Sequence, residues 1–118
     1  MTPEELKTRT KGLALRVIRL ARMLPHDPAG RTVANQIVRS ATSVGANYRA
    51  ACRAQSRATF AAKLAIAEEE ADETLYWLEI LAESRLVKEG RLQDLIKEAR
   101  EIVAIMTASR RTANTRPR

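Results

Sequence analysis

The chain has little of what small metal-binding, disulfide-linked or β-rich folds rely on. Its 118 residues include one Cys and one His, which excludes an internal disulfide framework and a usual structural zinc site. Glycines number only 4, which argues against an all-β fold with many tight turns. No apolar run approaches the ~18 residues of a membrane span, and the N-terminus lacks the layout of a signal peptide. We therefore expect one soluble, cytoplasmic, helical domain.

Positive charge is what the sequence has in excess. Its 21 Lys and Arg residues outnumber 14 Asp and Glu residues, for a net charge of +7. Residues 1–55 hold 10 basic and 3 acidic side chains, residues 56–90 hold 4 and 8, and residues 91–118 hold 7 and 3. This distribution predicts an acidic middle segment between two basic ones. A basic surface is the expected electrostatic footprint of a nucleic-acid-binding protein.

Four segments show the spacing of amphipathic helices. Thr2-Pro3 and Asp27-Pro28 each place a capping side chain before a proline, and Ser56 is expected to cap a third helix. Short connections between four such helices favour an all-α, antiparallel, up-down-up-down four-helix bundle over residues 1–110, with a flexible basic tail over residues 111–118. The predicted core stripes are Leu6, Leu13, Val17, Leu20 and Leu24; Val33, Ile37, Val38, Ala41, Val44, Tyr48 and Ala51; Phe60, Leu64, Ala67, Ala71, Leu75, Leu78 and Ala82; and Leu92, Leu95, Ile96, Ala99, Ile102, Val103 and Met106.

A second stripe on the third helix predicts a subunit interface. It contains Trp77, whose side chain alone could bury about 200 Å². The alternative is a wide core face, in which Trp77 packs against the edge of the fourth helix. A row of small polar residues on the second helix is expected to let helices approach closely, and it consists of Gln36, Ser40, Ser43 and Asn47. The predicted interface residues are Arg39, Ser43, Asn47, Ile66, Glu70, Glu73, Trp77 and Ile80.

Antiparallel packing of the second and third helices also predicts ion pairs. It would bring Arg39, Arg49 and Arg53 within reach of acids, namely Glu69, Glu70 and Glu73. These pairs are expected within one chain or between subunits. A partly buried pair of this kind would favour one helix orientation more than it would add net stability.

No constellation of residues predicts catalysis. A di-iron site in a four-helix bundle needs Glu-x-x-His pairs, whereas the one histidine, His26, lies in a proline-bounded loop. Cys52 has no His or second Cys close in sequence, and no Gly-rich phosphate loop is present. We predict a non-enzymatic protein with no metal and no cofactor.

Several basic residues have no acid near them in the pattern of predicted helices. They predict contacts to nucleic-acid phosphates without sequence preference, and the lack of interleaved aromatics argues against base stacking. A solvated basic surface, or a surface for an acidic protein partner, is the alternative. The candidate phosphate-binding residues are Arg9, Lys11, Arg16, Arg19, Arg22, Arg110 and Arg111.

Two motifs in order resemble a known bacterial family. The first is Gln-Ile-Val-Arg-Ser-Ala-Thr-Ser-Val-Gly-Ala-Asn-Tyr over residues 36–48, and the second covers residues 53–57 and 70–79, the latter Glu-Ala-Asp-Glu-Thr-Leu-Tyr-Trp-Leu-Glu. They are similar to the "four helix bundle protein" family, also called the S23 or 23S-rRNA-intervening-sequence protein family. The resemblance covers about residues 13–106.

This resemblance implies an antiparallel four-helix bundle that assembles as a homopentameric barrel. It also implies kinship with the accessory variability determinants of diversity-generating retroelements, which support a reverse transcriptase by binding nucleic acid. Expected partners are therefore further copies of the chain, RNA or DNA, and a reverse transcriptase. Many relatives carry an Asn-x-x-Glu-Gly-type segment, where this chain has Ala50 and Ala51 after Asn47. A role tied to that acid is not expected here.

Overall fold

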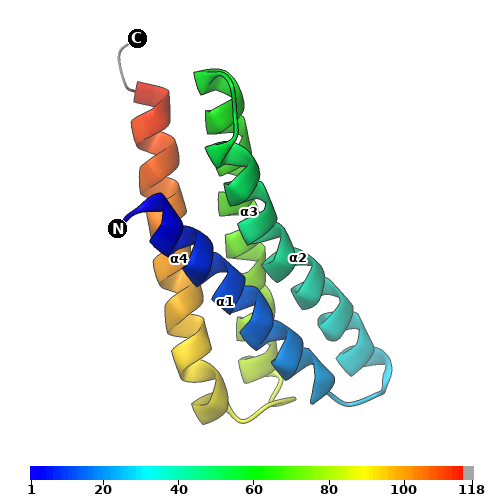
Figure 1. Cartoon of the computed structure of the whole chain (residues 1–118). Coiled ribbons are helices and arrows are strands. Elements are labelled where there is room, and N and C mark those ends of the chain that lie inside the picture. The colour runs from blue at the N-terminus through cyan, green and yellow to red at the C-terminus, as the bar shows by residue number, and fades with distance from the viewer. Residues whose placement is uncertain (116–118) are drawn as a thin grey trace.

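Four α-helices make up the chain in a computed structural model that describes residues 1–115. They are α1 (Pro3–Arg22), α2 (Pro28–Cys52), α3 (Arg57–Glu83) and α4 (Glu89–Thr115). Consecutive helices run in opposite directions, in the up-down-up-down order (Figure 1). Residues 1–115 contain no β-strand, so the prediction of an all-α fold with four helices is confirmed.

Three helices begin at the residues that the sequence marks as caps. The Thr2 hydroxyl accepts a hydrogen bond from the Glu5 backbone N–H at 3.1 Å, and the Ser56 hydroxyl accepts one from Thr59 at 3.1 Å. The Asp27 carboxylate accepts the N–H of Gly30 at 2.8 Å. Each cap satisfies a backbone donor that would otherwise lack a partner in the first turn, which is why α1, α2 and α3 start where they do.

The turn between α1 and α2 requires a glycine. A Cβ atom on Gly30 would lie 1.9 Å from the carbonyl oxygen of Pro25, which is backbone and cannot move aside. The glycine therefore lets the turn fold back tightly on the start of α2, and this fixes how α2 leaves α1.

The apolar stripes of the four helices meet in one core. Its fully buried members include Leu13, Ile37, Leu64 and Ile102, one from each helix. α2 packs against α1 and α3, and α3 packs against α2 and α4. α1 crosses the bundle at an angle and approaches α4 less closely than it approaches α2 (Figure 1). In the described part, α1 and α3 occupy diagonal positions with no close backbone approach.

The C-terminal boundary differs from the prediction. α4 continues to Thr115, so residues 111–115 are helical where a flexible tail was expected. The reason is Ala113, which lies seven residues after the core residue Met106 and is buried with an exposed fraction of 8%. A small side chain thus extends the apolar stripe by two turns. Residues 116–118, the remainder of the predicted tail, lie outside the described residues.

Candidate nucleic-acid interface

Arg9 is held in an ion pair by α4. Its Nε and Nη2 atoms donate to the two carboxylate oxygens of Glu98 at 2.9 and 2.6 Å, and Nη2 also reaches Glu101 at 2.9 Å. The hydrogen bonds to Glu98 raise the pKa of Arg9, and Arg9 in turn holds the pKa of Glu98 below its usual range. The expectation that Arg9 has no acid near it is wrong, because its partners are 89 and 92 residues away along the chain.

Arg110 is engaged in the same way between α4 and α3. Its Nε atom donates to Glu68, whose second carboxylate oxygen accepts the Thr107 hydroxyl at 2.5 Å. Arg110 is the main reason that the pKa of Glu68 lies below its ordinary value. The expectation that Arg110 has no acid near it is therefore also wrong.

The other predicted phosphate contacts stay exposed. Lys11, Arg16, Arg19, Arg22 and Arg111 are all solvent-exposed and make no ion pair within residues 1–115. The fold does not gather them in one place. Lys11 lies in a groove between α1 and α2, whereas Arg16 and Arg19 lie at the end of α1 next to the α3–α4 turn.

The first of these places is the α1–α2 groove, a surface depression of about 520 Å³. Its floor is made of small side chains, because α1 and α2 come very close there: a Cβ on Gly45 would lie 3.1 Å from the Thr10 hydroxyl oxygen. That hydroxyl is buried and donates to the Leu6 carbonyl at 2.9 Å. The groove is lined by Glu4, Lys7, Thr8, Thr10, Lys11, Ala14, Thr42, Gly45, Ala46, Arg49 and Arg53.

The charge of the α1–α2 groove is mostly positive. Its one carboxylate, on Glu4, is paired with Lys7 at 3.1 Å. Lys11, Arg49 and Arg53 line the groove and are without an ion pair in the described part of the chain. A shallow groove with a floor of small side chains and several exposed cations can accommodate a phosphate backbone, because phosphates can approach the cations without a bulky side chain in the way.

Arg49 and Arg53 are functional candidates that the sequence analysis assigned elsewhere. It expected them to pair with acids of α3, as Arg39 does, and the described residues contain no such pair. Helical geometry explains the error for Arg49: at 100° per residue, it lies about 280° around α2 from Arg39, on the side that lines the groove. Arg53 follows the last residue of α2 and lines the same groove. The spacing from Arg39 to Arg49 is the signal that could have separated them.

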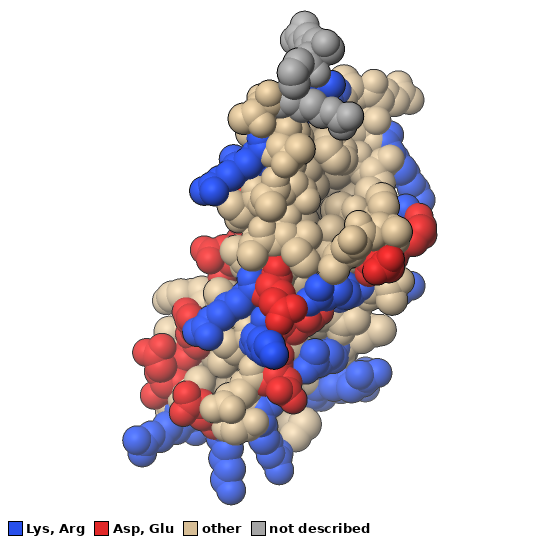
Figure 2. Space-filling view, turned by 90° about the vertical axis from the view of Figure 1, so that its left-hand side faces the viewer, with Lys and Arg blue, Asp and Glu red and all other residues tan. Residues whose placement is uncertain are grey.

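The second place is the helix-end pocket, a depression of about 560 Å³ between the last turns of α1 and the start of α4. Four exposed cations line it, and only Arg16 and Arg19 were predicted as site residues. Lys88 lies just before α4 and Arg91 lies in its first turn, far along the chain from α1. Figure 2 shows Lys and Arg side chains gathered at this lower end of the molecule. The lining residues are Arg16, Arg19, Leu20, Met23, Leu86, Val87, Lys88, Arg91, Leu92 and Leu95.

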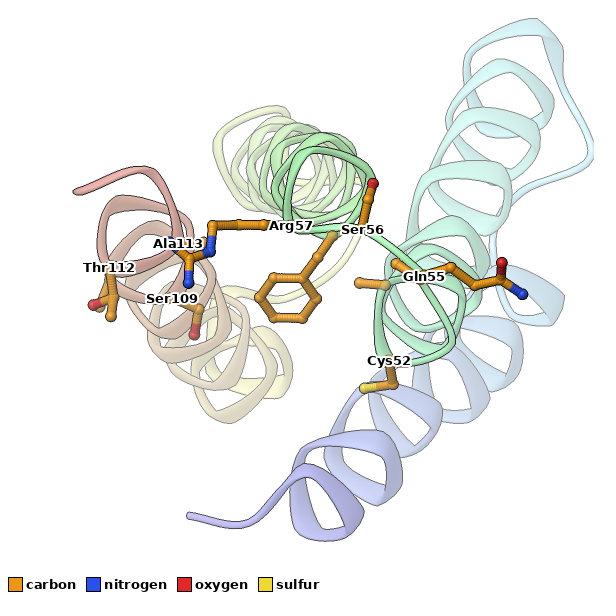
Figure 3. Close-up of a pocket in the computed structure, with 11 residues that line it drawn as sticks. Cys52, Gln55, Ser56, Arg57, Ser109, Thr112 and Ala113 are labelled. Atoms are coloured by element: carbon orange, nitrogen blue, oxygen red, sulfur yellow. The ribbon is translucent and has the colours of Figure 1, made fainter. Parts of the chain in front are cut away.

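A third cavity, of about 710 Å³, lies at the opposite end of the bundle (Figure 3). It opens between the α2–α3 turn and the last turns of α4, with Cys52 and Ser109 on opposite walls. Cys52 is an exposed free thiol, and neither a histidine nor a carboxylate lines the cavity. Within residues 1–115, no group of three His, Cys, Asp or Glu side chains could hold a metal ion, and no helix could cross a membrane.

Comparison with known proteins identifies the relatives of this chain. Residues 5–108 match the family model for the 23S rRNA-intervening sequence protein. The chain belongs to this family. It is also similar to the crystal structure of a protein of unknown function from the S23 ribosomal protein family of Bacteroides thetaiotaomicron, with 35% identity and a TM-score of 0.86. That match covers 95% of this chain and 100% of the other. No curated protein matches the sequence.

The residues that carry the S23-family resemblance meet along one line of contact, the α2–α3 seam. It comprises Arg39 and Ser40 of α2 with Glu70, Glu73 and Thr74 of α3, and Trp77 bonds Glu73 from within α3. At its centre, the buried hydroxyls of Ser40 and Thr74 lie 2.9 Å apart and link the two helices. Each of these hydroxyls also lies within hydrogen-bond distance of a carbonyl on its own helix.

Arg39 forms the polar edge of this seam. Its guanidinium bonds Glu70 at 3.0 Å and also Glu73, while the indole N–H of Trp77 donates to Glu73 at 3.1 Å. Trp77 first and then Arg39 lower the pKa of Glu73. The predicted reach of Arg39 to Glu70 and Glu73 is confirmed within one chain.

The predicted interface stripe is thus partly engaged within the protomer. Trp77 is half-buried and packs against the core, and Asn47 donates to the Ser43 hydroxyl at 2.9 Å. Ile80 also packs against the core, whereas Ile66 is 38% exposed. The role of these residues in subunit contacts stays a prediction.

Proposed function

We propose that this S23-family protein is a non-enzymatic accessory protein of the cytoplasm. It binds the backbone of RNA or DNA weakly, without sequence preference, and it does so as a homo-oligomer, most simply the homopentamer that the family resemblance implies. A reverse transcriptase is the protein partner that the same resemblance suggests. The nucleic-acid site is the α1–α2 groove.

One observation supports this site above the arginines that the fold already pairs with acids. Lys11, Arg49 and Arg53 come from two helices to one groove, and no acid within residues 1–115 forms an ion pair with them. By contrast, Arg9, Arg39 and Arg110 already bind carboxylates. Cations without a protein partner keep their full attraction for phosphate, because no carboxylate has to be displaced first.

Assembly would strengthen this weak binding. Every copy in a ring presents one α1–α2 groove, so a nucleic acid that spans two grooves binds the second one at a high effective concentration. Weak contact at each groove is therefore compatible with measurable affinity of the assembly. The absence of aromatic side chains from the groove favours backbone contact over base stacking.

Binding of a labelled oligonucleotide of about 20 nucleotides tests the proposal. We expect the native protein to bind RNA or DNA at low salt and the triple variant Lys11→Gln, Arg49→Gln, Arg53→Gln to bind at least about tenfold more weakly. A matched control, Lys63→Gln, Lys97→Gln, Arg100→Gln, removes the same charge away from the groove and should bind almost as the native protein does. No binding by the native protein at low salt would refute the nucleic-acid site.

A protein-interaction module is the second candidate function, because the same exposed cations suit an acidic protein. Purification of the native protein without nuclease discriminates between the two. A partner that remains after nuclease treatment, in the absence of any co-purified nucleic acid, would favour the protein-interaction module. Recovery of a reverse transcriptase would support the accessory role.

A further inference from the structure

The helix-end pocket combines two properties that the α1–α2 groove does not. Its floor is aliphatic, formed mainly by Leu20, Leu92 and Leu95, and its rim carries four cations without a single lining carboxylate. Arg16, Arg19, Lys88 and Arg91 make no ion pair in the described part of the chain. Such a pocket suits an apolar side chain flanked by acids. Its aliphatic floor offers a phosphate no hydrogen-bond donor, so the pocket suits the side chain of a protein better than a nucleic-acid backbone.

The outward side of α3 carries a surface with the opposite properties. Tyr76 is 52% exposed and is one of the few large hydrophobic side chains that lie on the surface of the described residues. Asp72 lies one turn before it and Glu83 two turns after it, on the same side of the helix. Both acids are exposed and have no ion pair within residues 1–115. This surface, formed by Asp72, Tyr76 and Glu83, is the α3 acidic patch.

From this match we infer that the helix-end pocket of one copy receives the α3 acidic patch of a second copy. Tyr76 would enter the aliphatic floor, where tyrosine is among the best interface anchors, and Asp72 and Glu83 would approach the four cations. The inference rests on the homo-oligomer in the proposed function and names its contact surface.

Within one chain, no ion pair joins the two surfaces among the described residues. The pocket lies between α1 and α4, whereas the patch is on α3, and α1 and α3 are diagonal in the bundle with no close approach of their described residues. The pocket and the patch lie at the same end of the molecule. Glu83 of the patch is the last residue of α3, and Leu86, three residues later, lines the pocket. Parallel copies placed side by side would therefore bring pocket and patch to the same level.

A contact between two different surfaces has a consequence for assembly. After the first contact, one copy keeps an unused patch and the other an unused pocket, so further copies add head to tail until the ring closes. Arg16 and Arg19 then lie between subunits. The α1–α2 groove, with Lys11, Arg49 and Arg53, remains exposed on every copy.

Charge reversal on each surface, alone and together, tests the inference by light scattering across a concentration series. Lys88→Glu with Arg91→Glu reverses the pocket, and Asp72→Lys with Glu83→Lys reverses the patch. All four side chains are exposed, so circular dichroism should show a native fold for each variant. We expect either reversal alone to raise the dissociation concentration at least about tenfold and the combined reversal to restore assembly. Tyr76→Ala should weaken assembly without any change of charge.

The control variant Lys97→Glu with Arg111→Glu makes the same change of charge at exposed α4 residues outside the pocket and should assemble normally. An oligomeric native protein that neither reversal affects would overturn this inference and leave the proposed homo-oligomer standing. The inference also fails if the combined reversal does not restore assembly, or if the pocket reversal weakens only nucleic-acid binding. A native protein that is monomeric at all concentrations would refute the homo-oligomer itself.

Discussion

The two sides of α2 use the same kinds of residue for different purposes. On the side toward α3, Arg39 is bound to carboxylates and the Ser40 hydroxyl is fully buried against Thr74. On the side toward α1, Arg49 is exposed and has no ion pair among residues 1–115, and the Thr42 hydroxyl donates to its own helix at 2.8 Å. The α2–α3 seam is closed, whereas the α1–α2 groove is open to an outside partner.

The difference shows how to interpret the net charge of +7. Arginines that already have a carboxylate partner help to fix one helix against the next and contribute little to the attraction of a nucleic acid. The cations that no carboxylate neutralises determine where a polyanion can bind. Total charge thus indicates a class of partner, and only pairing within the fold locates the site.

The largest effect is expected from a bulky residue in the closed seam. Ser40→Leu should lower the free energy of unfolding by about 3 kcal/mol, because the seam has no space for the added carbons and the link to Thr74 is lost. Thr42→Leu, in the groove, should change it by less than about 0.5 kcal/mol. Urea denaturation measures both, and equal losses would contradict the contrast between the two sides of α2.

A smaller effect is expected when only the hydroxyl is removed. Ser40→Ala should lower the free energy of unfolding by about 1 kcal/mol, because the hydrogen bond between α2 and α3 is lost. The Thr74 hydroxyl still donates to the Glu70 carbonyl at 2.8 Å and is not left without a partner. Thr42→Ala is the matched change on the groove side and should be close to neutral. If Ser40→Ala were equally neutral, the hydroxyl pair would not contribute to the stability of the seam.

Acid should lower the stability of the fold by protonating the carboxylates that hold the helices together. The pKa values of Glu68, Glu73 and Glu98 are lowered in the folded protein, by Arg110, Trp77 and Arg9 respectively. A lowered folded pKa adds stability above the unfolded value of about 4.3, and this stability is lost as the pH falls through the folded pKa. We expect the melting temperature to decline below about pH 4, and less steeply in Glu98→Gln. A decline of the same slope in that variant would exclude Glu98 as a cause.

The smallest effect compares two arginines of the same helix. Arg39→Gln should lower the melting temperature slightly, because Glu70 and Glu73 lose their partner. Arg49→Gln should leave it unchanged, since no ion pair is lost in the described structure. Scanning calorimetry of the two variants measures both melting temperatures. A larger loss for Arg49→Gln would mean that the groove side also stabilises the fold.

The sequence predicted local features of the fold well and long-range pairing less well. Caps such as Thr2 and Asp27 act within three residues, so their side chains alone predict where helices start. The partners of Arg9 and Arg110 could not be inferred in the same way, because they depend on how α1 crosses α4 and on the register of α3 with α4. Arg39 was predictable because a short turn fixes how α2 lies against α3.

The residues of the two surface sites also divide into those that the local sequence predicts and those that depend on helix packing. Lys11 was predicted from its position on a basic helix, but Arg53 and Arg91 could be placed only after the helices were packed. The helical extension to Thr115 was missed because Ala113 is too small to signal a buried position in a stretch that is otherwise polar. Small side chains carry little hydrophobic signal in a sequence and yet permit close packing in a structure.

The salt dependence of RNA binding tests the central claim most directly. Each lost phosphate contact should make the slope of log K against log salt shallower by about 0.7 to 0.9. The variant Lys11→Gln, Arg49→Gln, Arg53→Gln should therefore lose about 2 to 3 from the slope of the native protein. The variant Arg9→Gln, Arg39→Gln, Arg110→Gln removes the same charge from arginines that already have carboxylate partners, and it should keep the native slope. Equal losses in the two variants, or a native slope near zero, would contradict the account.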